Sequence, residues 1–246
     1  MNTEMVMDDL RGRLGGAGLE RVEACLNILT GAAAPTDADP SQEASRLYFP
    51  GLRARPWHDT AEFDWVPRAE AAYAACRDEA RALIDQGARF SPYEDPDTKE
   101  LGWRGWDTFP FYVTGKKYPQ SCARCPETVR VLDSLPHGTR QGMYSKLNPG
   151  AHITPHSGGS NIVLTCHMGL IVPEGCGIRV GDETRAWQEG KCLIFDDSYV
   201  HEAWNRGSGV RVVLLWDIWH PDLTSIEIQA LIRLSKLFKK HRRALQ

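Results

Sequence analysis

The sequence lacks several features that would assign it to a well-defined class of protein. Lysine and arginine together number 29 against 32 aspartate and glutamate, so the formal net charge is −3. That balance gives neither the basic surface of a nucleic-acid-binding protein nor a bias toward a membrane surface. No apolar run is long enough to span a bilayer, and residues 1–16 lack the apolar stretch of a secretory signal. We therefore expect a cytoplasmic protein with no nucleic-acid or membrane partner.

The seven cysteines form neither a disulfide framework nor a complete zinc motif. Their number is odd, they are scattered, and several lie inside apolar runs, which is typical of reduced thiols buried in a core. Cys122 and Cys125 form a CxxC pair, but a zinc site of this kind needs a second pair. We interpret the single pair as the entry to a helix.

Helical and strand patterns lie in different parts of the chain. Apolar residues recur at helical spacing in 6–30, and a linker rich in Pro, Ala and Asp follows at 32–45. Residues 67–87 form an amphipathic helical pattern that ends at a glycine. From 140 to 220 the chain is rich in β-branched and aromatic residues cut by turns, and after 222 a helical pattern returns. These patterns predict a mainly β fold, a sandwich or barrel, with flanking helices.

One strand candidate contains an arginine among large apolar residues. In GVRVVLLWDIW, alternation places Arg211 on the same face as Val213 and Leu215. A buried guanidinium needs a partner, and its own strand supplies none. Because arginine binds carboxylates in a bidentate manner, we expect the partner to be another strand or a ligand carboxylate.

Two histidines precede this arginine on separate strand candidates, and together the three residues suggest a metal site. His156 and His201 can hold a metal ion with open coordination positions. In many mononuclear iron enzymes a carboxylate stands two residues after the first histidine, but this chain has Gly158 there. With Arg211 on the next strand, this is the layout of Fe(II)/2-oxoglutarate oxygenases on a double-stranded β-helix.

Longer segments then resemble one family. YFPGLRARPWHD, GWDTFPFYVTGKK, SCARCPETVRVLDSLP, YSKLNPGAHITPH and the run from PHSGGSN to LLWDIWHPDLT are similar in order and spacing to the aspartyl/asparaginyl β-hydroxylases. The resemblance covers about residues 46–224. It implies a double-stranded β-helix (jelly-roll, cupin-like) core at about 140–220 within a catalytic domain of residues 46–246. Residues 1–45 would be a helical extension and linker, through which an oligomer could form.

The resemblance also implies roles for individual residues. The family has glycine at the position of Gly158, and it uses only two histidines as iron ligands, which correspond to His156 and His201. Arg211 and Ser145 would hold the distal carboxylate of 2-oxoglutarate, and His167 would contact its iron-side carboxylate. Fe(II), 2-oxoglutarate and O2 are the implied cofactors.

Several positions depart from the family pattern, and they concern the substrate. Family members that hold an aspartyl side chain do so with arginines, where this chain has Val163, Thr165 and Leu101. An anionic substrate would lose charge-assisted hydrogen bonds worth about 1.5–3 kcal/mol each. We therefore expect hydroxylation of a small molecule or amino-acid-derived substrate on a biosynthetic route. Trp106 is a candidate for contact with this substrate.

Two other functions remain open at this point. The open metal position at Gly158 is also what an Fe(II)/2-oxoglutarate halogenase needs, with chloride as the added ligand. The chain could also be a non-catalytic β-helix that binds a small ligand. Chloride dependence of the product would identify the halogenase, and release of succinate would exclude the binding module.

Overall fold

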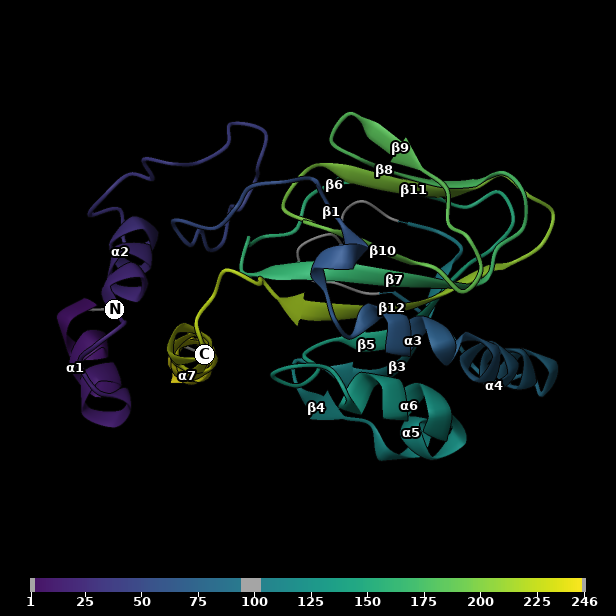
Figure 1. The fold of residues 1–246 in the computed structure, drawn as a ribbon, viewed down its shortest axis with the longest axis horizontal. Helices are drawn as coiled ribbons and strands as arrows, with labels where there is room; N and C mark the ends of the chain where they lie inside the picture. Colours follow the sequence, from purple (N-terminus) through teal and green to yellow (C-terminus); the bar gives the residue numbers. More distant parts are fainter. Residues whose placement is uncertain (1–2, 94–102, 245–246) are drawn as a thin grey trace.

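The fold is built around two antiparallel sheets, which a computed structural model describes for residues 3–93 and 103–244. Strands of the larger sheet lie in the order β1-β10-β7-β12-β5-β3-β2, with β4 paired to β3. Figure 1 shows this sheet facing a smaller one above it. The strands of the larger sheet are β1 (Trp57–His58), β2 (Ser91–Pro92), β3 (Trp106–Val113), β4 (Lys116–Lys117), β5 (Gly142–Leu147), β7 (Val163–Ile171), β10 (Cys192–Phe195) and β12 (Arg211–Trp219).

The smaller sheet has the order β6-β11-β8-β9. Its strands are β6 (His152–His156), β8 (Cys176–Val180), β9 (Glu183–Arg185) and β11 (His201–Asn205). Side chains of both sheets meet in one apolar layer, to which Leu147 and Val213 contribute from the larger sheet and Ile153 and Ala203 from the smaller. The residues that the sequence predicts to bind iron and 2-oxoglutarate lie on strands of both sheets.

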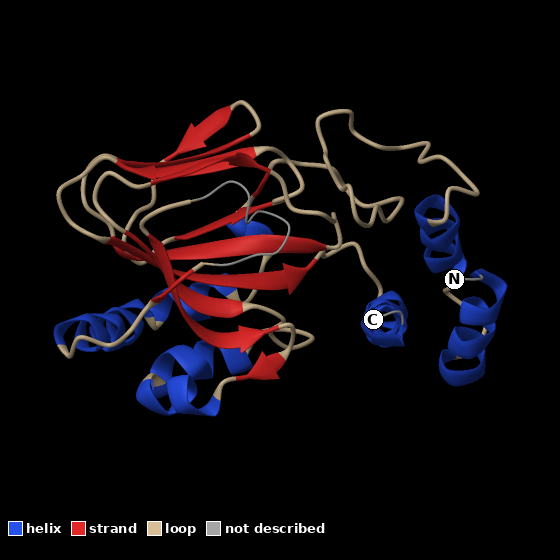
Figure 2. Ribbon diagram, turned by 180° about the vertical axis from the view of Figure 1, so that it is seen from behind, coloured by secondary structure: helices blue, strands red, loops and turns tan. Residues whose placement is uncertain are grey.

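Helices cover the other face of the larger sheet, as both ribbon views show (Figures 1 and 2). They are α3 (Val66–Ala71), α4 (Tyr73–Asp85), α5 (Pro119–Arg124) and α6 (Pro126–Asp133), preceded by the 3-10 helix η1 (Thr60–Glu62). Outward-facing strand residues such as Leu164, Met168 and Trp216 pack beneath them in a second, larger core. Apolar side chains therefore line both faces of the central strands, which explains why β7 and β12 read as nearly continuous apolar runs.

The ends of the chain pack against each other. Helices α1 (Thr3–Leu14) and α2 (Glu20–Leu29) bury Leu10, Val22 and Leu26 against the C-terminal helix α7 (Ser225–Ala244) in a third cluster. The guanidinium of Arg21 donates two hydrogen bonds, of 2.7 and 2.8 Å, to the buried Glu227 carboxylate of α7. The apolar faces of the first two helices are thus used within the chain.

The prediction of one helix over residues 6–30 is wrong in its continuity. The chain breaks between α1 and α2, where Gly15 and Gly18 adopt φ values of 86° and 78°. Only glycine takes this backbone conformation readily, so the two glycines end one helix and redirect the next. The predicted helix at 67–87 is also divided, at Ala72, into α3 and α4.

Facing antiparallel sheets with flanking helices confirm the predicted fold class, a double-stranded β-helix of the jelly-roll, cupin-like type. Within the described ranges, no helix is both long and apolar enough to cross a bilayer.

Candidate functional site

Two histidines lie side by side on neighbouring strands of the smaller sheet. His201, the first residue of β11, lies directly opposite His156, the last residue of β6, and their ring centroids are 4.1 Å apart. Directly opposed residues of an antiparallel pair project to the same face, so both rings enter the layer between the sheets. Strand pairing therefore brings the two predicted metal ligands together.

Hydrogen bonds fix the orientation of both rings in the same way. Nδ1 of His156 lies 2.9 Å from the Thr154 carbonyl oxygen, and Nδ1 of His201 lies 2.9 Å from that of Tyr199. Since a carbonyl only accepts, each Nδ1 donates the hydrogen in its contact, which leaves Nε2 as the ring nitrogen that could bind a metal ion. Burial, with a contribution from His156, lowers the pKa of His201 to about 3, so this ring is neutral, which is the form that binds a metal ion.

A buried arginine faces the histidine pair from the larger sheet. Arg211 is 1% exposed, and burial lowers the pKa of its guanidinium to about 10, so it remains charged at neutral pH. Its Nη1 donates to the carbonyl and hydroxyl oxygens of Ser145 at 3.2 and 3.3 Å, whereas Nε has no partner among the residues that the structure describes. The Trp106 indole also donates to the Ser145 hydroxyl, at 2.9 Å. That hydroxyl thus accepts twice and keeps its own hydrogen for another group.

His167, like Arg211, is buried on the inner face of the larger sheet. Its Nδ1 accepts a hydrogen bond from the Trp187 indole at 3.3 Å, so the proton lies on Nε2. That Nε2 is buried and has no partner within the described residues. Burial, then the charge of Arg211, lowers the pKa of His167 well below its usual value. The ring is therefore a neutral donor, and the described part of the chain supplies no acceptor for its Nε2–H.

Two tryptophans at the site were missed by sequence reasoning. Trp187 stacks under Arg211, with the guanidinium carbon 4.6 Å from the ring centroid, and also orients His167. Trp103 lies edge-on against His156 at 4.5 Å and donates to the Thr154 hydroxyl at 2.9 Å. Neither lies in a strand pattern that would have distinguished it from a core tryptophan.

Gly158 lies against a carboxyl group from another loop. A Cβ at this position would lie 2.5 Å from Oδ1 of Asp197, and the Gly158 amide donates to the Asp197 carbonyl at 2.6 Å. Desolvation, reinforced by the charges of Asp217 and Asp196, raises the pKa of Asp197 to about 8. A side chain at position 158 is therefore excluded by the space that Asp197 takes.

The predicted substrate positions are separated by the fold. Thr165 faces the layer between the sheets and hydrogen-bonds Asp197, but Val163 packs in the cluster of terminal helices. Trp106 lies beside Ser145, and Leu101 is outside the described residues. His152 bonds Glu202 at 2.7 Å and is exposed.

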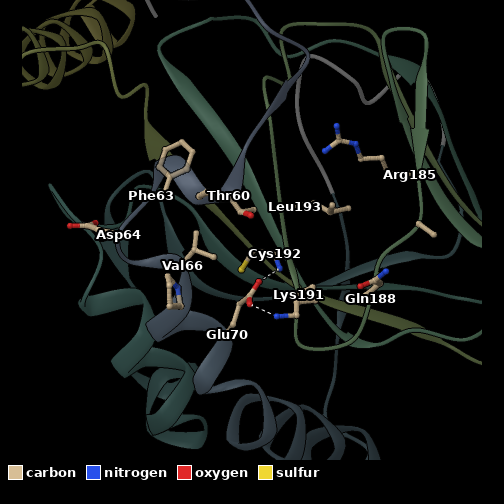
Figure 3. Close-up of a pocket in the computed structure, with 13 residues that line it drawn as sticks. Thr60, Phe63, Asp64, Val66, Glu70, Arg185, Gln188, Lys191, Cys192 and Leu193 are labelled. Carbon is tan, nitrogen blue, oxygen red and sulfur yellow. Dashed lines mark hydrogen bonds and ion pairs between the residues drawn. The ribbon is translucent and has the colours of Figure 1, made fainter.

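An open pocket lies elsewhere on the molecule. Figure 3 shows it between α3 and the β10 region, where Glu70 of α3 accepts hydrogen bonds from the side chain of Lys191 and the amide of Cys192. Neither histidine of the pair nor Arg211 lines it. Glu70 and Lys191 form an ion pair in this pocket, and Arg185 pairs with Glu183.

The donor set fits the predicted cofactors. Two neutral imidazole nitrogens suit Fe(II), and no group of three or more His, Cys, Asp or Glu among the described residues could hold a metal ion. The remaining positions on a metal ion would thus be open to small molecules. The partnerless nitrogens of Arg211 and His167 are the counterparts that a ligand with two carboxylates would need.

Comparison with known proteins identifies the family. A profile of the aspartyl/asparaginyl beta-hydroxylase family matches residues 70–221, which is more than half of the chain. The chain belongs to the aspartyl/asparaginyl β-hydroxylase family. It is a hydroxylase-family protein, and the suspected resemblance is confirmed.

Individual members of the family differ in length and in name. The chain is 38% identical over 182 residues to human aspartyl/asparaginyl beta-hydroxylase, covering 71% of this chain but only 24% of the human protein. It is 43% identical over 205 residues to rat aspartate beta-hydroxylase domain-containing protein 2, covering 79% and 60%. With ornithine lipid ester-linked acyl 2-hydroxylase of Rhizobium tropici the identity is 38% over 185 residues, covering 73% and 66%.

Among solved structures, a prolyl hydroxylase from Trichoplax adhaerens, in complex with a peptide of hypoxia inducible factor, superposes with a TM-score of 0.45 at 15% identity. That alignment covers 60% of this chain and 78% of the other.

Proposed function

We propose that the protein is an Fe(II)- and 2-oxoglutarate-dependent dioxygenase that hydroxylates an unactivated C–H bond. The observation that carries this proposal is the pairing of two metal-facing imidazoles on one sheet with a buried, incompletely paired arginine on the other. Bound Fe(II) with 2-oxoglutarate and O2 would supply the oxidation, giving the alcohol, succinate and CO2. The family membership supports the same reaction class.

Each residue of the site has a defined task in this reaction. His156 and His201 would hold the metal ion through Nε2, because both Nδ1 atoms are committed to carbonyl oxygens. The Nε2–H of His167 would donate to one carboxylate of 2-oxoglutarate, and Arg211 with the Ser145 hydroxyl would hold the other. The tight apolar layer between the sheets excludes water from the reacting centre.

Anaerobic addition of Fe(II) and 2-oxoglutarate tests this assignment. We expect the weak visible charge-transfer band of the chelated metal, and we expect it to be lost in His201→Ala. Addition of O2 should then release succinate. Correctly folded protein that gives neither the band nor succinate would instead be a non-catalytic ligand-binding module.

Asp197 favours hydroxylation over halogenation. The space beside Gly158, where a halogenase would bind chloride, contains a carboxyl oxygen within 2.5 Å of the missing Cβ position. A carboxylate repels a halide, and a protonated carboxyl still occupies the volume. The mass of the product should therefore show one added oxygen and no chlorine, even at high chloride concentration.

The substrate that we propose is a small molecule or an amino-acid-derived compound, made or modified in a biosynthetic pathway of the cytoplasm. Thr165 contributes a hydroxyl, and Val163 lies in a different cluster, so neither brings a cation to an aspartyl side chain. One relative is named for an ester-linked acyl chain of ornithine lipid and another for aspartyl and asparaginyl groups. Succinate release in the presence of an acylated amino-acid lipid, compared with an aspartate-containing peptide, would distinguish these classes.

A further inference from the structure

A third chain segment, residues 39–47, lies against the histidine pair; we call it the clasp. It follows α2, and Figure 1 shows the chain leaving α2 and running toward the sheets. Two loops connect the sheets beside the histidines: residues 157–162 join β6 to β7, and residues 196–200 join β10 to β11. His156 immediately precedes the first loop, and His201 immediately follows the second.

The clasp is bonded to the second loop at three points. The Gln42 side-chain amide donates to Oδ2 of the fully buried Asp196 at 2.7 Å. The amide of Glu43 donates to the Ser198 carbonyl at 2.7 Å, and the Tyr199 hydroxyl donates to Asp39 at 2.9 Å. Tyr199 also provides the carbonyl that orients the His201 ring, so this hydrogen-bond chain ends at a metal-facing histidine.

The same segment is bonded to the first loop. The Ser157 hydroxyl donates to the Glu43 carboxylate at 2.9 Å, and the amides of Arg46 and Leu47 donate to the Gly159 carbonyl at 2.8 and 3.0 Å. A Cβ on Gly159 would collide with the Arg46 side chain, so glycine permits this close approach. Glu43 touches both loops, through its amide on one side and its carboxylate on the other.

We propose that the clasp is a positioning element of the metal site, which holds the loops carrying His156 and His201 at the separation that two-histidine binding requires. The two histidines lie on one sheet, but each is attached to a loop that crosses to the other sheet. Apart from the contacts through the clasp, the hydrogen bond that we find directly between these two loops is the one that the Gly158 amide donates to the Asp197 carbonyl. The metal site would thus depend on residues that precede the family profile match, which starts at residue 70.

This inference rests on the proposed function, because it concerns the same metal ion. Groups that orient metal ligands without touching the metal typically change metal affinity by about 10- to 100-fold when removed. The clasp should therefore affect metal affinity and leave the affinity for 2-oxoglutarate unchanged, since Arg211 and Ser145 lie on the larger sheet.

Gln42→Glu is the decisive variant because it is nearly isosteric. It replaces the amide donor with a carboxylate oxygen that faces Oδ2 of Asp196 and repels it. We expect the affinity for Mn(II), measured by the EPR signal of the free ion with saturating 2-oxoglutarate and no O2, to fall by about 10-fold or more. Adding Asp196→Asn supplies a side-chain amide that can donate to the carboxylate introduced at position 42. The double variant should therefore regain most of the affinity for Mn(II).

Gln86→Glu is the matched control. Gln86 is exposed at the end of α4, and its side-chain oxygen accepts from Arg124, so the same charge is added away from the site. This control should bind Mn(II) as the unaltered protein does. Should Gln42→Glu fail to fold, Glu43→Gln, which weakens the contact with Ser157, carries the same test with a smaller expected loss.

The outcomes separate the two proposals. If the unaltered protein takes up no Mn(II), the proposed metal site is wrong, and the clasp inference is wrong with it. If it binds Mn(II) and Gln42→Glu binds equally well, only the clasp inference is overturned. A loss of affinity that the double variant does not restore, together with a lower melting temperature, would show that the clasp acts on folding alone.

Discussion

Replacing Arg211 with methionine should strongly weaken the binding of 2-oxoglutarate without destabilising the ligand-free protein. Burial lowers the guanidinium pKa from 12.5 to about 10, and each pKa unit corresponds to about 1.4 kcal/mol. Because the group is protonated in both the folded and the unfolded chain below pH 10, this penalty of about 3 kcal/mol is present throughout the neutral range. Methionine removes the charge at similar volume and therefore removes the penalty.

The interactions that Arg211→Met removes stabilise the folded protein by an amount similar to this penalty. The hydrogen bonds to Ser145 are long, at 3.2 and 3.3 Å, and the contact with the Trp187 ring is worth about 0.5–2 kcal/mol. We expect the free energy of unfolding of the ligand-free variant to lie within about 1 kcal/mol of the unaltered protein, or above it. Two charge-assisted bonds to a carboxylate are worth about 3–6 kcal/mol, so 2-oxoglutarate affinity should fall by two to four orders of magnitude.

Urea unfolding with and without 2-oxoglutarate, under Mn(II) and without O2, measures both quantities. Arg179→Met is the control, since Arg179 pairs with Glu202 on the smaller sheet and is only partly buried. It should retain the stabilisation by 2-oxoglutarate. An Arg211→Met protein that loses several kcal/mol without ligand, or that is still stabilised by 2-oxoglutarate, would refute the reasoning.

Three further changes have defined outcomes. His156→Ala or His201→Ala should abolish Mn(II) binding, as measured by EPR, and full retention in either variant would refute the metal assignment. Trp187→Phe removes the donor to Nδ1 of His167 and should raise the KM for 2-oxoglutarate while leaving metal affinity unchanged. Burial lowers the pKa of His58 to about 4, so the unfolded chain binds the proton first as pH falls below about 6.5. The free energy of unfolding should therefore decline by about 3 kcal/mol between pH 6.5 and 4, and this decline should be reduced in His58→Phe; equal slopes would contradict it.

The interior residues of the sheets were predictable because strand alternation is a local property. Alternation correctly placed Arg211 on an inward face, and strand pairing then brought His201 opposite His156. Val163 was named as a substrate position, but the end of its strand is covered by the terminal helices. No local pattern encodes that covering, because it arises from contacts between opposite ends of the sequence.

Contacts made by irregular segments could not be predicted in the same way. Composition identified residues 32–45 as a linker, and this expectation did not reveal that Gln42 reaches a carboxyl 154 positions away. Likewise, Trp187 follows β9 in irregular structure, and its position between an arginine and a histidine depends on how the two sheets stack. Side-chain chemistry could be read from the sequence, whereas the partners of loop residues required the folded chain.

In the proposed metal site, the direct opposition of His156 and His201 makes metal binding depend on the alignment of β6 and β11. A shift of β11 by one residue against β6 would turn the His201 ring to the outer face, and the pairing already changes register between His201 and Ala203. A chain with any other alignment could keep its apolar layers partly filled, but it would bring one histidine instead of two to the metal. Metal uptake by newly folded protein would thus select the correctly aligned sheet from its alternatives, before any substrate is encountered.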